Sequence, residues 1–400
     1  MAAILLITNY PLDGQQSMWR AAGLIESGLR ANGVEVLVAR PQPFFGLLGK
    51  GQPRVGKWLA YLDKYLVFPI ILIWRARRCL LVHIVDHSNA IYLFWLRSQK
   101  SIVTCNDLLA VRSARGEIPE HRTGFSGKLL QKWIQAGLRR ATHIACISEA
   151  TRLDVLRLTG KSEREVSRIY LGLGPIFEAE MERKLNEQKK REPNEDLQFG
   201  KAALPRDRRY PRNTIKSPSR RPCGNPTLPV PYILHVGGGT WYKNREGVLK
   251  IYVELRRRLG SESPNLIMVG PPLESRIHGV CFLQNVTDDL LVELYRNAAL
   301  LLFPSLYEGF GWPVVEANAC GCPAVASRID SLVEAGGNAA VWIEDPRDIN
   351  QAAERVIEVL HDDSAKKRSR QEAGFGNARR FSYREMIAQY LALYTSILRE

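Results

Sequence analysis

Short apolar runs alternate with longer amphipathic stretches through the first half of the chain. The runs are six or seven residues long and rich in branched side chains, which is typical of buried strands. They cover Ala2–Thr8, Val34–Ala39, Leu80–Asp86, Ser101–Asn106, His143–Ser148 and Val166–Leu171. Helical patterns lie between several of them, including Gln16–Ala31, Lys128–Arg140 and Glu149–Thr159. This alternation predicts β-α-β units and a doubly wound parallel sheet.

A second alternating series begins near residue 231. Its strand-like runs are Tyr232–Val236, Asn265–Val269, Leu300–Phe303, Ala324–Ala326 and Ala339–Trp342, with helical patterns between them. The sequence therefore predicts an α/β protein of two doubly wound, Rossmann-like domains, residues 1–182 and 231–380. Such halves are expected to face each other across a ligand-binding cleft. The last segment, 381–400, is expected to form an amphipathic helix over Tyr383–Leu398 that can cross back to the first domain.

Residues 183–230 interrupt this pattern with a basic, proline-rich stretch that is expected to be a linker or an insertion. The net charge of +15 is concentrated in two places. Residues 183–221 hold thirteen Lys and Arg against five Asp and Glu, a net of +8, and residues 50–78 hold seven against one, a net of +6. The rest of the chain is nearly neutral, so we expect no nucleic-acid partner.

Cysteine usage and hydropathy favour a cytoplasmic protein. The seven cysteines are scattered and form no C-x-x-C pair, which is typical of reduced thiols. The apolar start, Met1–Thr8, reads as a strand and lacks the features of a signal peptide. No apolar run reaches the ~20 residues of a transmembrane helix.

A glycine-rich turn follows the run Tyr232–Val236. It reads Gly237-Gly238-Gly239, and Lys243-Asn244 comes shortly before a helical pattern. Glycines let backbone amides approach a diphosphate, and the start of a helix favours negative charge. Lys243 would add a positive charge there. From these residues alone, an ordinary turn between strand and helix is an equally open interpretation.

A second loop carries two carboxylates. After the run ending at Phe303, the sequence Glu308-Gly309-Phe310-Gly311 leads to Pro313, which suits the first turn of a helix. Glu316 then falls inside that helix. Carboxylates accept hydrogen bonds from sugar hydroxyls, and the glycine amides can donate to the same ligand.

These motifs resemble glycosyltransferase family 4, a family of retaining enzymes with the GT-B fold. The resemblance covers nearly all of residues 231–385. It is carried by the E-x7-E element Glu308–Glu316, Lys243-Asn244, Val269-Gly270-Pro271, Cys322–Ser327 and Ser331–Glu334. The first half is similar more loosely, through Gly14, Val82–Asp86, Val103–Asp107 and Ile147–Glu149.

The resemblance implies a role for each matching residue. Glu316 would hold the nucleotide's ribose hydroxyls, and Lys243 would stabilise the departing diphosphate. The other donor-binding residues implied are Gly14, Gly238, Gly239, Glu308, Gly309, Phe310 and Gly311. The sequence contains no Asp-x-Asp metal anchor. A metal-independent site that needs no cofactor is therefore expected, with the nucleotide-sugar as substrate.

Two positions depart from the family pattern. Tyr242 stands where relatives often carry Arg, so one of two expected phosphate charges is missing or comes from elsewhere. Asn106 stands where relatives commonly carry His, and Asn cannot take a proton. His87 could substitute for it, or could instead cap the following helix. The candidate catalytic residues are therefore Glu308, Lys243, His87 and Asn106.

The expected function is transfer of a hexose from a UDP- or GDP-sugar to a glycan or lipid-linked saccharide, with retention of configuration, in bacterial polysaccharide synthesis. A nucleotide-sugar-binding regulatory protein without turnover and a nucleotide-sugar epimerase remain as alternatives. The apolar, basic segment Trp58–Leu81 fits either a helix at the inner surface of the cell membrane or a buried helix with a basic end.

Overall fold

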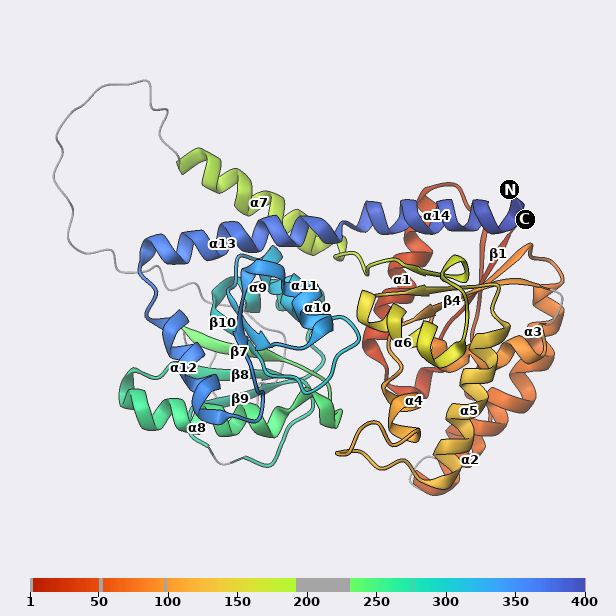
Figure 1. The fold of residues 1–400 in the computed structure, drawn as a ribbon, viewed down its shortest axis with the longest axis horizontal. Helices are drawn as coiled ribbons and strands as arrows, with labels where there is room; N and C mark the ends of the chain where they lie inside the picture. Colours follow the sequence, from red (N-terminus) through yellow and green to blue (C-terminus); the bar gives the residue numbers. More distant parts are fainter. Residues whose placement is uncertain (1–2, 50–52, 97–98, 192–230, 276, 400) are drawn as a thin grey trace. The chain divides into compact units, whose positions relative to one another are not determined.

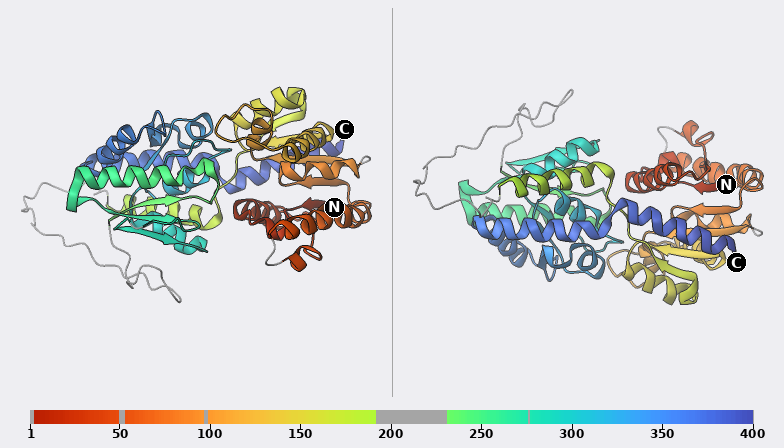
Figure 2. Two further views of the ribbon diagram at one scale, coloured as in Figure 1. Left: turned by 90° about the horizontal axis from the view of Figure 1, so that it is seen from below. Right: turned by 90° about the horizontal axis from the view of Figure 1, so that it is seen from above.

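The computed structural model describes residues 3–49, 53–96, 99–191, 231–275 and 277–399. The chain divides into two compact units, each built on a six-stranded parallel sheet (Figure 1). Unit 1 comprises residues 1–174, 308–310 and 381–400, and unit 2 comprises residues 175–307 and 311–380. Helices cover both faces of each sheet (Figure 2), so the expected doubly wound α/β architecture is confirmed. Residues 192–230 of the expected linker lie outside the described residues.

The sheet of unit 1 has the strand order β2-β1-β3-β4-β5-β6. Its strands are β1 Ile4–Ile7, β2 Val36–Ala39, β3 Leu81–Ile84, β4 Lys100–Cys105, β5 His143–Cys146 and β6 Val166–Arg168. Its helices are α1 Gln16–Ala31, α2 Pro53–Leu62, α3 Phe68–Ala76, α4 Leu109–Ala114, α5 Phe125–Arg140, α6 Glu149–Thr159 and α14 Tyr383–Arg399. The central strands are buried, because helices pack on both sides of them.

The last helix, α14, is fixed to the sheet of unit 1 by buried polar side chains. Tyr394 Oη lies 2.7 Å from Nδ1 of His83 on β3, and Tyr390 Oη lies 2.8 Å from Oγ1 of Thr104 on β4. His83 Nε2 lies 2.8 Å from the same Thr104 Oγ1. Because His83 is fully buried, its pKa is lowered to about 3, and its ring is neutral at physiological pH.

Unit 2 has the strand order β12-β11-β10-β7-β8-β9. Its strands are β7 Tyr232–Val236, β8 Asn265–Val269, β9 Val280–Leu283, β10 Ala298–Phe303, β11 Ala324–Ser327 and β12 Ala340–Ile343. Its helices are α7 Pro175–Arg191, α8 Arg245–Leu259, α9 Asp288–Asn297, α10 Trp312–Ala319, α11 Asp330–Gly336, α12 Ile349–Leu360 and α13 Ser364–Ala378. The helices α8 and α12 supply much of the core on one face, through Val248, Ile251, Leu255, Ala352 and Val356.

Between α2 and α3 the chain forms a π-helical turn, Asp63–Val67. Asp63 is buried although it is charged, and its carboxylate accepts three hydrogen bonds. Tyr10 Oη and the Gly46 amide donate to Oδ2, each at 2.8 Å, and the Phe45 amide donates to Oδ1 at 2.9 Å. These bonds tie the turn to the end of β1 and to the loop around Phe45.

The predicted elements agree closely with the observed ones, with one exception. The predicted Gln16–Ala31, Glu149–Thr159, Tyr232–Val236 and Asn265–Val269 have the observed bounds, whereas β9 was not predicted. Five of the seven cysteines are free and buried, as expected of reduced thiols, namely Cys79, Cys105, Cys146, Cys320 and Cys322.

Candidate active site

The glycine turn and residues 304–307, the start of the loop after β10, lie side by side in unit 2. Strand β7 ends at Val236, the turn Gly237–Gly239 follows, and a short 3-10 helix, Trp241–Lys243, leads into α8. Asn244 adopts a left-handed conformation (φ 51°). Its Nδ2 donates to Pro304 O at 2.9 Å and to Pro346 O at 3.1 Å. These bonds attach the turn that carries Lys243 to the loop that follows β10.

Two further contacts fix the same pair of loops. The Leu306 amide donates to Tyr242 O at 2.8 Å, and the rings of Trp241 and Tyr307 lie 5.5 Å apart. Lys243 Nζ lies 5.2 Å from the ring centroid of Phe303, the last residue of β10. The ammonium group is therefore held at the carboxyl end of the central strands, where open α/β sheets bind their ligands.

The predicted amide donors of this turn differ in how closely they are packed. A Cβ atom at Gly238 would meet no atom within 4 Å, whereas one at Gly239 would lie 3.1 Å from Pro271 Cγ. The backbone at Gly238 can thus be approached closely, which is what a diphosphate requires of a glycine turn.

Glu316 is buried inside unit 2. It occupies the second turn of α10, which begins after Gly311. Gly311 has φ 113°, and a Cβ there would lie 2.4 Å from Leu332 Cδ2, so only glycine fits. Tyr295 Oη on α9 donates to Glu316 Oε2 at 3.1 Å. The carboxylate is thereby held in one orientation by a neighbouring helix.

The segment Glu308–Phe310 groups with unit 1, although its neighbours in the chain belong to unit 2. Glu308 is half-buried. A Cβ at Gly309 would lie 2.1 Å from Asn106 O, so this close approach requires glycine. Ser148 Oγ donates to Gly309 O at 2.7 Å, and Phe310 packs against Phe381 with centroids 5.3 Å apart. The structure thus brings Asn106 and Gly309 together.

Asn106 and His87 follow the carboxyl ends of β4 and β3. Asn106 is buried, and its Oδ1 has no hydrogen-bond partner among the described residues. His87 begins a 3-10 helix, His87–Phe94, that is capped by Asp86, whose Oδ1 accepts from the Ser88 amide at 3.0 Å. His87 Nδ1 lies 3.3 Å from the same oxygen but makes no hydrogen bond. The cap is therefore Asp86 and not His87.

The remaining predicted residue, Gly14, ends a 3-10 helix, Pro11–Asp13, with φ 65°. The side chain of Gln15 beside it accepts a hydrogen bond from Asn9 Nδ2, which also donates to Asp86. Gly14 is thus linked, through Gln15 and Asn9, to the residue that precedes His87.

Two buried residues of unit 2 were not singled out from the sequence. His235 lies on β7 and Arg245 begins α8, and both are nearly inaccessible. Burial first, and the charges of Arg245 and Lys243 in addition, lower the pKa of His235 to about 3. The sequence alone could have drawn attention to Arg245, because a cation in the first turn of a helix is unfavourable beside the helix dipole.

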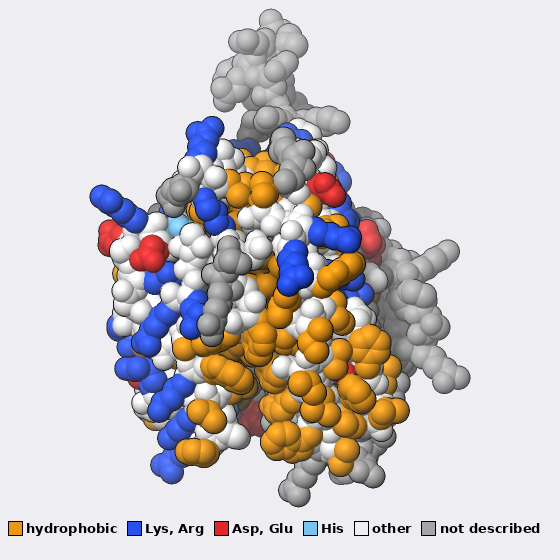
Figure 3. Space-filling model, turned by 90° about the vertical axis from the view of Figure 1, so that its right-hand side faces the viewer, with side chains coloured by type: hydrophobic (Ala, Val, Ile, Leu, Met, Phe, Trp, Pro, Cys, Tyr) orange, Lys and Arg blue, Asp and Glu red, His pale blue; other side chains and the backbone are white. Residues whose placement is uncertain are grey.

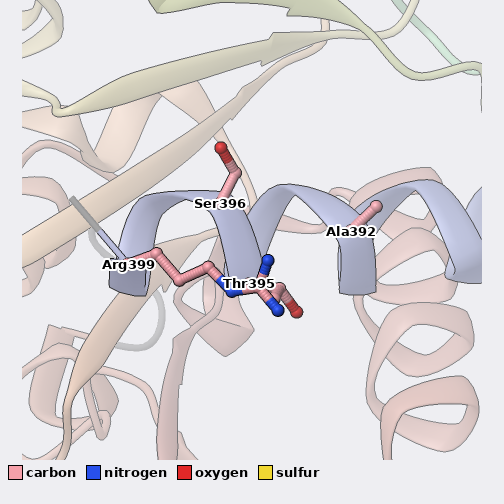
Figure 4. A pocket seen from close by; sticks show the side chains of 4 residues that line it. All are labelled: Ala392, Thr395, Ser396 and Arg399. Carbon is pink, nitrogen blue, oxygen red and sulfur yellow. The ribbon is translucent and has the colours of Figure 1, made fainter.

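Other features of the described residues do not add to this site. No group of three or more His, Cys, Asp or Glu side chains among them could hold a metal ion. A hollow on α14 is lined by Ala392, Thr395, Ser396 and Arg399 (Figure 4). Close to it, Ile397 O accepts from Nζ of Lys100, the first residue of β4. The hollow therefore lies near the amino end of that strand, away from Asn106.

Two family profiles match the chain. The profile described as Glycosyltransferase Family 4 matches residues 23–174, and the one described as Glycosyl transferases group 1 matches residues 225–374. The chain is 31% identical to O-antigen chain mannosyltransferase B of Escherichia coli over 175 residues, 41% of this chain and 45% of the relative. It is 32% identical to O-antigen chain mannosyltransferase RfbU of Salmonella typhimurium, over 33% of this chain and 39% of the relative. The matches thus span less than half of either relative.

Solved structures are similar over the whole chain. Sucrose-phosphate synthase from Thermosynechococcus elongatus has a TM-score of 0.68 at 18% identity, covering 100% of both chains. HepE of Anabaena, in complex with UDP and glucose, has a TM-score of 0.61 at 16% identity, covering 99% of this chain and 100% of that one. At this identity the likeness shows the fold. Because the two profiles together span about three quarters of the 400 residues, the chain belongs to glycosyltransferase family 4, a family of retaining glycosyltransferases with the GT-B fold.

Proposed function

We propose that the chain transfers a hexosyl group, with mannosyl as the first candidate, from a nucleoside-diphosphate sugar to a glycan or lipid-linked saccharide, with retention of configuration. One observation carries this proposal: in unit 2 the turn that bears Lys243 is hydrogen-bonded to the loop that leads to Glu316. A cation and a buried carboxylate thus lie at one end of one sheet. The names of the mannosyltransferase relatives support the choice of sugar.

Two carboxylates, Glu316 and Glu308, are proposed to bind different parts of the donor. Glu316 accepts hydrogen bonds from the ribose hydroxyls, and Glu308 binds the hydroxyls of the donor sugar with the amides of Gly309, Phe310 and Gly311. The acceptor oxygen bonds to the anomeric carbon on the face from which the diphosphate leaves. The electron pair of the broken bond goes to the diphosphate, and the acceptor's proton goes to a departing phosphate oxygen or to His87.

Positive charge near the leaving group lowers the barrier, since negative charge grows on the diphosphate as the bond breaks. Lys243 and the amides of Gly238 and Gly239 supply it in this proposal. Transfer is therefore expected without added metal. Gly14 and Asn106 are assigned to binding of donor and acceptor, because Asn106 offers an amide but no base.

Calorimetry with GDP-mannose and UDP-glucose in the presence of EDTA tests the proposal, followed by assays of transfer and of donor hydrolysis. Binding that is lost in Glu316→Ala, with a product of retained configuration, is the expected result. No binding of either donor would refute it. Binding without transfer or hydrolysis would support the regulatory alternative, for which Asn106 is the reason, and gain of activity in Asn106→His would then identify the defect. Interconversion of donors without an acceptor would indicate an epimerase.

We further propose that unit 1 docks on an anionic membrane surface, where a lipid-linked acceptor would be presented. Hydrophobic side chains gather on one face beside Lys and Arg (Figure 3). Every fourth residue from α2 to α3 is apolar and exposed, and Trp58 is 71% exposed. The stripe consists of Trp58, Leu62, Leu66, Ile70 and Trp74. No helix among the described residues is long and apolar enough to cross a membrane.

The π-helical turn keeps this stripe on one side. Four residues advance about 40° around an α-helix, so five such positions would spread over about 160°. The π-turn Asp63–Val67 accommodates one extra residue, so the helix after it is turned back by about 100°. The five stripe residues then lie within an arc of about 80° around the helix axis. Stripe residues on both sides of the turn therefore face the same way.

A second stripe lies on α5, where Phe125, Leu129 and Trp133 are exposed at a spacing of four residues. Trp133 contacts Tyr65 of the π-turn, with ring centroids 6.5 Å apart, so the two stripes are neighbours. Arg78 stacks on Trp74 at 4.3 Å. Aromatic side chains beside cations fit an interface of acyl chains and anionic head groups.

Flotation with phosphatidylglycerol vesicles and with phosphatidylcholine vesicles tests this surface. We expect binding to the anionic vesicles only, and loss of binding in Leu66→Glu/Ile70→Glu. The matched control is Leu153→Glu, an exposed leucine on α6 outside the stripes. Equal binding by wild type and the double variant, or concentration-dependent dimers that the double variant abolishes, would refute the membrane assignment.

A further inference from the structure

Arg245 is a buried cation without a counter-ion among the described residues. It is the first residue of α8 and is 5% exposed. Nη1 donates to Pro271 O, but Nε and Nη2 are buried and have no hydrogen-bond partner among the described residues. No described carboxylate forms an ion pair with it. A buried guanidinium in this state is costly unless an anion binds nearby.

The guanidinium of Arg245 lies next to Gly270, which in turn contacts Gly237 of the glycine turn. A Cβ at Gly270, which has φ 137°, would lie 3.4 Å from Arg245 Cζ and 2.1 Å from Gly237 O. A Cβ at Gly237 would lie 2.8 Å from His235 Nε2. That nitrogen is also buried and lacks a partner among the described residues, while Nδ1 lies 3.0 Å from Leu302 O. Three nitrogens that lack a partner in the described part of the chain therefore lie close to Gly237 and Gly270.

The position of Arg245 in the helix points the same way. A cation at the start of α8 opposes the helix dipole, which favours an anion there. Burial lowers the pKa of Arg245, so the charge is not stabilised by the protein around it. A bound anion at the turn would offset both effects at once.

We propose that Arg245 is the second cation of the diphosphate site, acting from behind the turn Gly237–Gly239 in place of the arginine that Tyr242 replaces. This inference rests on the proposed function, because it takes the anion to be the diphosphate of a nucleotide. Lys243 then contacts the diphosphate, and Arg245 adds positive charge behind the turn without touching the ligand. Arg245 fixes the turn through Pro271 and adds charge in a place from which water is excluded, where charge acts over short distances with little screening.

Calorimetry with GDP, UDP, guanosine and uridine tests the inference on Arg245→Met. We expect affinity for the nucleoside diphosphate to fall at least tenfold, affinity for the nucleoside to stay unchanged, and the melting temperature without ligand to stay the same or rise. Arg257→Met is the matched control, since Arg257 is exposed on the same helix and pairs with Glu254. A lower melting temperature with unchanged diphosphate affinity would mean that Arg245 is purely structural, and would overturn the inference.

Arg245→Lys keeps the charge and covers the case in which the methionine variant does not fold. Diphosphate affinity within about threefold of wild type is expected. A loss as large as that in Glu316→Ala would show that charge is not what Arg245 supplies. The two proposals fail differently. Wild-type protein that binds no nucleotide refutes the proposed function, whereas nucleotide binding that needs Glu316 but is indifferent to Arg245 refutes only this inference.

Discussion

Tyr295 Oη donates a hydrogen bond to Glu316 Oε2 across a distance of 3.1 Å, inside the core of unit 2. Tyr295 is fully buried on α9 and packs edge-on against Phe177, with ring centroids 6.2 Å apart. The orientation of a candidate ribose-binding carboxylate therefore depends on a helix that carries none of the predicted site residues.

Tyr295→Phe removes this hydrogen bond and keeps the ring. We expect the free energy of unfolding to fall by about 1 kcal/mol and nucleotide affinity to fall severalfold, less than in Glu316→Ala. Tyr232→Phe is the matched control, because Tyr232 is equally buried and its Oη donates to Leu294 O at 2.7 Å. Chemical denaturation and calorimetry would distinguish them. If both variants lose the same affinity, the Tyr295 bond has no specific role in binding.

Lys243→Ala is expected to reduce turnover more than it reduces donor affinity. The charge it would stabilise grows as the glycosidic bond breaks, so the loss should be about 10²-fold in kcat. Steady-state kinetics and direct binding of the donor would measure both, with Lys250→Ala, an exposed lysine on the following helix α8, as control. A large loss of affinity with unchanged kcat would assign Lys243 to ground-state binding instead.

Most of the fold was predictable because burial imposes periodicity on the sequence. Strands such as β7 and β8 are buried apolar runs with clear ends. The missed strand β9, Val280–Leu283, lies at the edge of its sheet and is an apolar run of only four residues, which is too short for periodicity to identify a strand.

The candidate site was predictable only as far as neighbouring residues form its motifs. The pairing of the turn at Lys243 with the loop after Phe303 follows from the order of parallel strands. The approach of Gly309 to Asn106 joins residues some two hundred positions apart, and no local pattern encodes it. Arg245 escaped notice because its significance lies in missing partners, and partners are a property of the folded chain.

The buried His83 gives unit 1 a defined sensitivity to acid. Its pKa is about 3 in the folded state and about 6.5 in the unfolded chain, so the unfolded state binds more protons between these values. Stability is therefore expected to fall by about 1.4 kcal/mol per pH unit below about pH 6.5. His83→Asn should reduce that slope in denaturant titrations at several pH values. The exposed His361→Asn should leave it unchanged, and equal slopes in all three proteins would contradict the prediction.

Glu180 on α7 also makes stability depend on pH, but its pKa is lowered because its charged form is paired in the folded state. Burial alone would raise its pKa, but hydrogen bonds and charges from Arg183 and Arg296, both at 2.7 Å, lower it to about 2. The contribution of the Glu180 carboxylate to the free energy of unfolding is thus complete above about pH 4.5 and is lost as the pH falls toward 2. Glu180→Gln should cost about 2 kcal/mol at pH 7 and progressively less in that window. Glu182→Gln, at an exposed glutamate on the same helix, serves as control, and a cost independent of pH would rule out the ion pairs as its source.

The π-turn at Asp63–Val67 also makes the helices around it sensitive to length in a way that composition does not reveal. A substitution at Leu66 or Ile70 alters one point of the apolar face. Removing a single residue within the turn would convert it to a regular α-helix and leave Trp58 and Leu62 facing the same way relative to Trp74, whereas inserting one residue between Leu62 and Trp74 would rotate them by about 100°. Every side chain would still be present, yet the face would be divided. This part of the chain is therefore expected to vary through evolution by exchange of residues and to tolerate very few insertions between Leu62 and Trp74.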